Sequence, residues 1–146
     1  MQVEIQGDDE RRFWSKVDGS DGPLRCWVWT DTPNEDGYGR FRLGKKSKLA
    51  HRVAWEYLNG SIPEDPATGR PLDLDHECRH RLCVNPWHLD PVTSAENSRR
   101  ASWYLAANMC KRGHVYTADN ERFTSAGSRY CLDCIRVIRA AKKRAA

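Results

Sequence analysis

The chain lacks a long apolar run, and only 39% of its 146 residues are hydrophobic. No stretch approaches the roughly 18 consecutive apolar residues of a membrane-spanning helix, so no membrane segment is expected. The acidic N-terminal stretch MQVEIQGDDE lacks the apolar core of a secretory signal peptide. Internal repeats and low-complexity segments are also missing. These absences predict a cytoplasmic protein with one domain, or with one domain and a small appendage.

A hydrophobic content this modest does not predict a single large core, so the fold needs other stabilising elements. The six cysteines are the obvious candidates. Cytoplasmic thiols stay reduced, which favours metal ligands over disulfides. Charge is uneven along the chain. Residues 99–146 carry eleven Lys and Arg against three acids, and residues 1–98 carry thirteen against seventeen. The basic C-terminal part indicates either a surface for a polyanion or a solvated tail.

Local patterns predict mixed helices and strands. The stretch 8–18 reads as a helix capped by Asp8 or Asp9, with Val17 on its apolar face. Residues 26–30 read as a strand, and alternation over 38–46 puts Arg40 and Arg42 opposite Phe41 and Leu43. Helices are expected at 49–60, with Leu58 on the apolar face and Gly60 as its stop, at 93–108, capped by Thr93 or Ser94, and at 135–146. The tryptophans expected in the core around the zinc site, with base-stacking platforms as the alternative, are Trp27, Trp29, Trp55 and Trp87.

Four residues near the C-terminus have the spacing of a tetrahedral metal site. Cys110 and His114 are separated by three residues, Cys131 and Cys134 by two, and the sixteen residues between the pairs suit a hairpin. Cys-x-x-Cys turns direct two thiolates at one zinc ion. The alternative is a redox Cys-x-x-Cys beside two unrelated residues, but no thioredoxin-like βαβ pattern accompanies it.

The other three cysteines predict a second site. Cys78 and Cys83 form a loose knuckle, His88 follows, and Cys26 stands far upstream. This Cys3His set and the C-terminal set together use every cysteine. Zinc binding, worth on the order of 10 kcal/mol per structural site, would stabilise so small a core. His88 has two alternatives, a packed core histidine and a ligand of a catalytic metal.

Residues of a different chemical class remain between these ligands. Asp75 and Asn97 are hard oxygen donors that suit Mg2+ or Mn2+, and a strand–turn–helix unit would bring them together. The ordinary pKa of a histidine is near neutrality, so His76 could take a proton from water. A water nucleophile beside such a cation suits phosphodiester hydrolysis. Nearby, His80 is expected on the surface of the knuckle, and Asn85-Pro86 is expected to shape a turn.

At these positions the sequence resembles HNH endonucleases of the His-Me finger (ββα-metal) superfamily, above all zinc-stapled homing endonucleases and phage and actinobacterial HNH nucleases. The motif runs Asp75-His76, Asn85-Pro86, His88-Leu89, Glu96-Asn97. In the family, the general base precedes a Cys by two residues, a second Cys by seven, a zinc-binding His by twelve and a metal-binding Asn by twenty-one. Here these offsets fall on Cys78, Cys83, His88 and Asn97. The stretches GYGRF, AHRVAWEYLNGSIP and CKRGH with its later cysteine pair extend the resemblance from about Phe13 to Arg139.

The resemblance implies roles for single residues. His76 resembles the general base, and Asn97 resembles a ligand of the single catalytic Mg2+ or Mn2+. Asp75 resembles the second metal ligand of the Asp-His branch, although zinc-stapled homing enzymes lack an acid there. Many HNH enzymes orient the base with an Asn at the position of His88. If His88 binds zinc, a backbone carbonyl in the Arg81–Cys83 loop would fix the tautomer of His76.

The predicted fold is α+β. Residues 1–107 would form a small ββα-metal core with an N-terminal helix and the zinc site of Cys26, Cys78, Cys83 and His88. Residues 108–146 would form a zinc-binding hairpin, held by Cys110, His114, Cys131 and Cys134, and a basic helix. Basic residues expected on DNA, with salt bridges or solvation as their alternatives, are Arg40, Arg42, Lys45, Lys46, Lys48, Arg52, Arg99, Arg100, Arg136, Arg139, Lys142, Lys143 and Arg144.

The predicted activity is metal-dependent DNA endonuclease cleavage that leaves 5′-phosphate and 3′-hydroxyl ends. Double-stranded DNA is the expected partner, in the cytoplasm of a bacterium or a phage-infected cell. A homodimer would supply the second catalytic centre for a prompt double-strand break. The rival hypothesis is a non-catalytic, zinc-dependent DNA-binding module derived from such a nuclease.

Overall fold

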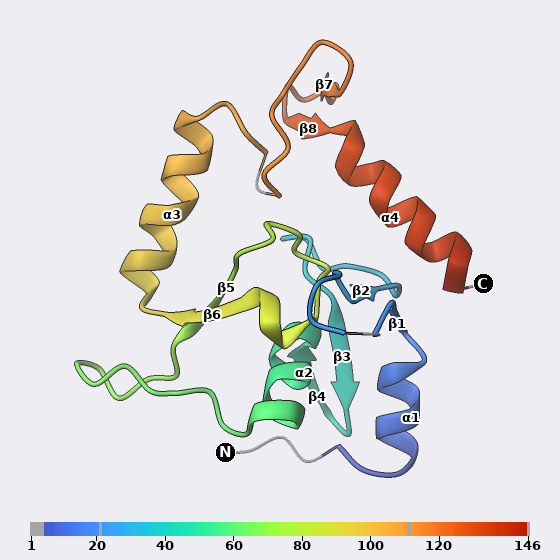
Figure 1. The fold of residues 1–146 in the computed structure, drawn as a ribbon, viewed down its shortest axis with the longest axis vertical. Helices are drawn as coiled ribbons and strands as arrows, with labels where there is room; N and C mark the ends of the chain where they lie inside the picture. The colour runs from blue at the N-terminus through green and yellow to red at the C-terminus, as the bar shows by residue number, and fades with distance from the viewer. Residues whose placement is uncertain (1–4, 21, 111, 146) are drawn as a thin grey trace.

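The computed structural model describes residues 5–20, 22–110 and 112–145 (Figure 1). The chain contains both helices and strands, as the sequence predicts. The elements in chain order are α1 (Asp8–Trp14), β1 (Val17–Asp18), β2 (Val28–Trp29), β3 (Arg40–Leu43), β4 (Lys46–Leu49), α2 (Ala50–Asn59), β5 (Asp73–His76), the short 3-10 helix η1 (Pro86–His88), β6 (Leu89–Val92), α3 (Ser94–Ala106), β7 (Glu121–Phe123), β8 (Arg129–Cys131) and α4 (Leu132–Ala145). None of the described helices has both the length and the apolar character of a membrane span.

Strands in the described residues pair into four two-stranded antiparallel sheets, β1–β2, β3–β4, β5–β6 and β7–β8. The sheet β5–β6 is followed directly by α3, and together they make a ββα unit (Figure 1). Its register sets Asp75 opposite Asp90 and His76 opposite Leu89. The Thr93 hydroxyl accepts a hydrogen bond from the backbone N–H of Glu96, as expected of the N-cap of α3.

Helix α2 forms where the apolar spacing predicts it. Its Ala50, Val53 and Ala54 are buried, which is the i, i+3, i+4 pattern of one helical face. Gly60 ends the helix with a positive φ of 82°, a conformation that glycine adopts without strain. Leu58, expected on the same face, is 44% exposed near the end of the helix.

Aromatic side chains from distant segments form the main core. Phe13 lies 5.2 Å from Trp29 and 5.1 Å from Phe41 between ring centroids. Gly39 is required beside them, since a Cβ at this position would lie 2.4 Å from Cδ1 of Trp29. Fully burying each such ring is worth about 1.5–3 kcal/mol, so these contacts join α1, β2 and β3.

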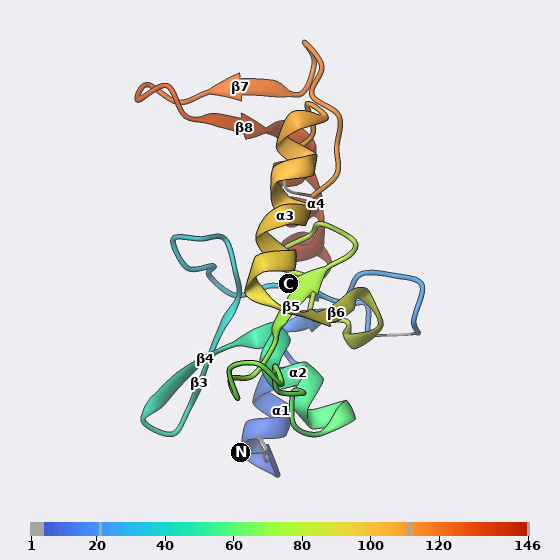
Figure 2. The same cartoon turned by 90° about the vertical axis from the view of Figure 1, so that its left-hand side faces the viewer.

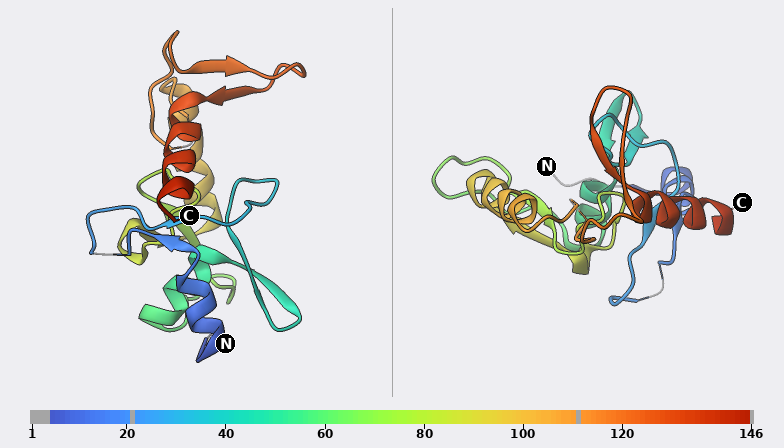
Figure 3. Two further views of the ribbon diagram at one scale, coloured as in Figure 1. Left: turned by 90° about the vertical axis from the view of Figure 1, so that its right-hand side faces the viewer. Right: turned by 90° about the horizontal axis from the view of Figure 1, so that it is seen from above.

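Helix α4 packs onto the same core (Figure 3). Ala141 is fully buried there and Ile138 is partly buried against it. At the end of the helix, Arg144 donates to the Asp18 carboxylate at 3.0 Å. The two units predicted at 1–107 and 108–146 are therefore in contact through α4. Figure 2 shows the β7–β8 hairpin at the far end of the molecule from α1 and α2.

Several local expectations need correction. Helix α1 ends at Trp14 and its N-cap is Gly7, because Asp8 and Asp9 lie inside the first turn and pair with arginines three residues later. Val17 belongs to β1, where it pairs with Trp29. Trp27 and Trp29 are core residues, but Trp87 is 61% exposed. His80 is buried instead of exposed, and burial lowers its pKa to about 4.

Candidate active site

Asp75, the candidate metal ligand, and His76, the candidate base, are consecutive residues of β5. Their side chains therefore point to opposite faces of the strand. Both Asp75 and His76 are buried. The His76 ring lies among two other rings, with centroid distances of 4.8 Å to His51 and 5.7 Å to Tyr38. His51, in the first turn of α2, is a neighbour that the sequence reasoning did not assign. The sequence feature that could have pointed to His51 is a polar residue between Ala50 and Val53 on the apolar face of a predicted helix.

The contacts of His76 specify its protonation. Its Nε2 lies 3.0 Å from the backbone carbonyl of Cys83, which can only accept a hydrogen bond. Nε2 therefore carries the proton and Nδ1 has the lone pair. Burial lowers the pKa of His76, so the ring is neutral near pH 7. The carbonyl lies in the Arg81–Cys83 loop, where the sequence placed it.

The Asp75 carboxylate is held by two arginines. Arg79 donates to its two oxygens at 2.6 and 3.1 Å, and Arg100 of α3 donates to it at 3.0 Å. Arg100 also bonds Asp90 and Glu96. A buried carboxylate needs such partners, because leaving its charge uncompensated costs several kcal/mol. Arg100 was expected on DNA, but in the structure it joins α3 to the β5–β6 sheet.

Asn97 lies in the first turn of α3, and its amide donates to the Asp73 carboxylate at 3.3 Å. Asp73 and Asp75 share one face of β5, and Asn97 and Arg100 share one face of α3. Asn97 contacts Asp73 and Arg100 contacts Asp75, so α3 is joined to β5 at two carboxylates. Asp73 was missed, although its position two residues before Asp75 was a usable signal. Carboxylate and amide oxygens are the ligand types that Mg2+ and Mn2+ prefer, although both Asp75 oxygens here accept hydrogen bonds from arginines.

Four side chains form a Cys3His cluster near His76. The ligand atoms of Cys26, Cys78, Cys83 and His88 all lie within 4.8 Å of one another. Nδ1 of His88 is 3.6 Å from the sulfurs of Cys26 and Cys83. Hydrogen bonds from neighbouring thiols lower the pKa of Cys78 and raise that of Cys26 to about 12. This cluster 1 has the donors and the spacing of a tetrahedral zinc site.

Backbone pairing brings the distant Cys26 to cluster 1. The Trp29 N–H donates to the Leu82 carbonyl, and the Val84 N–H donates to the Trp27 carbonyl, both at 2.8 Å. Asn85 adds a buried anchor, since its amide donates to the Arg25 carbonyl at 2.7 Å. It also caps η1 by accepting a hydrogen bond from the Trp87 N–H at 3.1 Å. Asn85 thus shapes a turn, as predicted, and additionally holds the segment that carries Cys26.

His88 is oriented by its second ring nitrogen. Its Nε2 lies 2.9 Å from the Pro23 carbonyl, so this nitrogen donates and Nδ1 faces the thiols. A ligating histidine is usually held in this way by a hydrogen bond from the nitrogen that does not bind the metal. His76 has its own carbonyl partner on Cys83. The two histidines therefore lie in separate groups, one among thiols and one among aromatic rings.

The C-terminal residues form a second Cys3His group, cluster 2, made of Cys110, His114, Cys131 and Cys134. Nδ1 of His114 is 3.3 Å from the sulfur of Cys134. A hydrogen bond from Cys134 lowers the pKa of Cys110 to about 4. The expected hairpin, β7–β8, connects the two ligand pairs. Asn120 supports it, because its amide donates to the Val115 carbonyl at 3.0 Å and to Asp133 at 2.7 Å.

The residues predicted to contact DNA differ in how the protein holds them. Some are held by the protein: Arg52 donates to the Leu72 carbonyl, Lys48 lies 3.8 Å from Glu56, and Arg144 pairs with Asp18. Others pair with an acid on the same surface, as Arg99 does with Glu96 and Arg136 with Asp133. The exposed residues of the set outside these pairs are Arg40, Arg42, Lys45, Lys46, Arg139, Lys142 and Lys143.

Residues 48–99 match the family described as HNH endonuclease. This segment contains Asp75, His76, Cys78, Cys83, His88 and Asn97, so the resemblance predicted from the motif is confirmed.

Curated relatives include two phage proteins. The chain is 33% identical over 70 residues to the "Uncharacterized gene 5.3 protein" of Enterobacteria phage T3, covering 44% of this chain and 63% of that protein. It is 33% identical over 75 residues to "Protein 2.8" of Escherichia phage T7, covering 50% and 46%. A third, the "Nuclear factor I family protein" of Caenorhabditis elegans, is 30% identical over 95 residues, covering 61% of this chain and 11% of that protein. The chain thus spans less than two thirds of each relative. No solved structure matches it.

Proposed function

We propose that this protein is a divalent-metal-dependent DNA endonuclease of the HNH type with His76 as its general base. One observation carries the proposal. His76 is buried, is held in one tautomer by the Cys83 carbonyl and lies beside Asp75 on β5, within the segment that matches HNH endonucleases. Strand β5 therefore carries a neutral base on one face and, at Asp75 on the other face, carboxylate oxygens of the type that a hard cation prefers.

His76 would take a proton from water at Nδ1 while Nε2 keeps its hydrogen bond to the Cys83 carbonyl. The water oxygen forms a bond to phosphorus, and the bond between phosphorus and the 3′ oxygen breaks. The products are a 5′-phosphate and, after protonation, a 3′-hydroxyl. A single Mg2+ or Mn2+ bound by Asp75 and Asn97 would stabilise negative charge on the phosphate. Because burial lowers the pKa of His76, the base is already neutral at pH 7.

We assign two structural zinc ions, one to each cluster. Cluster 1 includes Cys83, whose backbone carbonyl holds His76, so zinc there would fix the base through the same loop. Cluster 2 would fix the β7–β8 hairpin and the start of α4, since Cys134 lies in the first turn of that helix. Both ions are proposed from thiolate and imidazole donors, which zinc prefers over Mg2+.

Double-stranded DNA is the proposed substrate, in a bacterial cell infected by a phage. Exposed basic side chains on β3 and α4, such as Arg40, Arg42 and Arg139, would contact phosphates without reading sequence. A homodimer would place one catalytic centre on each strand. The phage origin of two relatives supports the cellular setting.

The decisive experiment is plasmid nicking by wild type and by His76→Ala in Mg2+ and in Mn2+. We expect wild type to nick the plasmid, and His76→Ala to lose at least about 100-fold in rate, as general-base removal does. Zinc content and DNA affinity of the variant should remain those of wild type. Full activity in the variant would refute the mechanism. DNA binding by wild type without cleavage in Mg2+, Mn2+ or Ni2+ would favour the non-catalytic binding module.

A further inference from the structure

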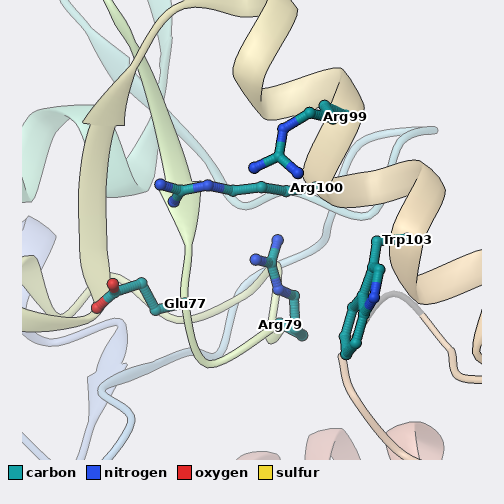
Figure 4. Close-up of a pocket in the computed structure, with 5 residues that line it drawn as sticks. All are labelled: Glu77, Arg79, Arg99, Arg100 and Trp103. Carbon is teal, nitrogen blue, oxygen red and sulfur yellow. The ribbon is translucent and has the colours of Figure 1, made fainter.

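A hollow beside the candidate active site combines cations with an aromatic ring. It has a volume of about 400 Å³ and is lined by Glu77, Arg79, Arg99, Arg100 and Trp103. Figure 4 shows Glu77 and Trp103 on opposite sides of it, with the three guanidinium groups between them. We call this the arginine–tryptophan hollow. Its size lies within the range of small-molecule sites, which is about 300–1,000 Å³.

The arginine–tryptophan hollow is adjacent to the proposed catalytic residues. Arg79 and Arg100 line it and also hold the Asp75 carboxylate, which precedes His76 in β5. A ligand in the hollow would therefore lie one side chain away from the proposed metal ligand.

The cations of the hollow differ in how firmly they are held. Arg79 and Arg100 are largely buried and pair with buried or partly buried acids. Arg99 is exposed, and its partner Glu96 lies on the same helix surface. An ion pair in water is weak and is easily exchanged for a phosphate, to which a guanidinium can donate two parallel hydrogen bonds. Arg99 is thus the phosphate-binding candidate.

Trp103 adds an aromatic ring, which a site that binds only phosphate would not need. Its side chain is 60% exposed, and it follows Arg99 and Arg100 by one helical turn on α3. An indole that is more than half exposed beside arginines is an arrangement on which nucleic-acid bases stack. In an intact duplex both faces of a base are already stacked, so only an unpaired base reaches such a platform.

We propose that the arginine–tryptophan hollow binds one unpaired nucleotide of the DNA strand next to the cleaved phosphate, with its base on Trp103 and its phosphate on Arg99. This inference rests on the proposed function and narrows its substrate to DNA with an unpaired nucleotide at the cleavage site, as in a gap, bubble or single-stranded end. It also separates two contributions to binding, because stacking depends on the base and the ion pair does not.

The test compares two labelled 12-mers, oligothymidylate and the same sugar–phosphate backbone without bases, in buffer without added divalent cations. Wild type should bind oligothymidylate roughly 5- to 100-fold more tightly than the abasic strand by fluorescence anisotropy, since stacking is worth about 1–3 kcal/mol per base. Trp103→Ala should lose this preference and Trp103→Phe should keep most of it. Trp87→Ala is the matched control, because Trp87 is equally exposed but lies outside the hollow.

Arg99→Ala should weaken binding of both strands alike and reduce the salt dependence by about one phosphate contact. An unchanged base preference in Trp103→Ala would overturn the proposal. If wild type nicks plasmid DNA despite that result, only the hollow is refuted. Absence of both binding and nicking in wild type would refute the hollow and the nuclease together. A base preference without nicking would support the hollow and reject catalysis.

Discussion

The two Cys3His clusters have the same donors but different positions in the fold. Cluster 1 collects its ligands from position 26 to position 88, and its Cys83 is fully buried and bonds the candidate base. Cluster 2 collects its ligands from position 110 to position 134. Nearby apolar side chains there are exposed, with Val115 at 56% and Phe123 at 61%. The same Cys3His ligand set thus lies beside the candidate active site in one region and beside a peripheral hairpin in the other.

This difference has a physical basis. Cluster 1 closes a long loop and shares its backbone with the segment that holds His76, so its loss should propagate into the site. Cluster 2 closes a short loop around the β7–β8 hairpin. It meets the rest of the chain through α4, whose Ala141 and Ile138 pack on the main core, and across a hollow that Cys110 and Cys134 share with Arg81. Loss of cluster 2 should therefore affect DNA affinity more than the chemical step.

The largest effect should come from Cys26→Ala. Removing the one upstream ligand leaves three ligands of cluster 1 and frees the segment before Trp27. We expect zinc to fall from two ions to one per chain and plasmid nicking to fall by at least about 100-fold, because the Cys83 loop no longer fixes His76. Elemental analysis and a nicking time course measure both. Retained zinc with normal nicking would contradict the role of cluster 1.

The second-largest effect should come from a residue that holds the Cys26 segment of cluster 1 but is not itself a ligand. Asn85→Ala removes the buried amide that donates to the Arg25 carbonyl. We expect zinc affinity of cluster 1 to fall about 10- to 100-fold, as loss of such outer contacts typically does. Competition with a chromogenic chelator measures it. Zinc at cluster 2 should leave at the wild-type rate, which makes that cluster the internal control.

Cys134→Ala is the matched change in cluster 2. We expect loss of one zinc ion and about a 10-fold loss of DNA affinity, while cleavage at saturating DNA stays within a few-fold of wild type. Hydrogen exchange should accelerate around β7 and β8 and remain slow in β5, since local stability differs between regions. A collapse of cleavage equal to that of Cys26→Ala would show that the two clusters are equivalent.

The smallest effect concerns pH. His76 must be neutral to accept a proton, and burial lowers its pKa below the ordinary 6.5. The cleavage rate should therefore reach half its plateau below pH 6.5, because it falls only as pH drops through the lowered pKa. Zinc content measured at each pH separates protonation of the base from loss of the clusters. A rate that already halves at pH 7 would be inconsistent with a buried neutral His76.

Local features of this protein follow from the sequence alone. Gly60 ends α2, Thr93 caps α3, and alternation places Arg40 and Arg42 opposite Phe41, because these features depend on residues within one or two turns or strands. The ligand spacings of both clusters are equally local, apart from Cys26. Short-range sterics and hydrogen bonding are enough to specify such features.

The tertiary structure alone decided which faces are covered. It buried His51 and His80, exposed Trp87, and gave Asp75 two arginine partners from opposite sides. It also set Arg99 and Trp103 beside the candidate site. Burial and ion pairing depend on elements that lie far apart in the chain, so periodicity cannot reveal them. Spacing therefore indicates which residues can act together, and packing determines what each of them touches.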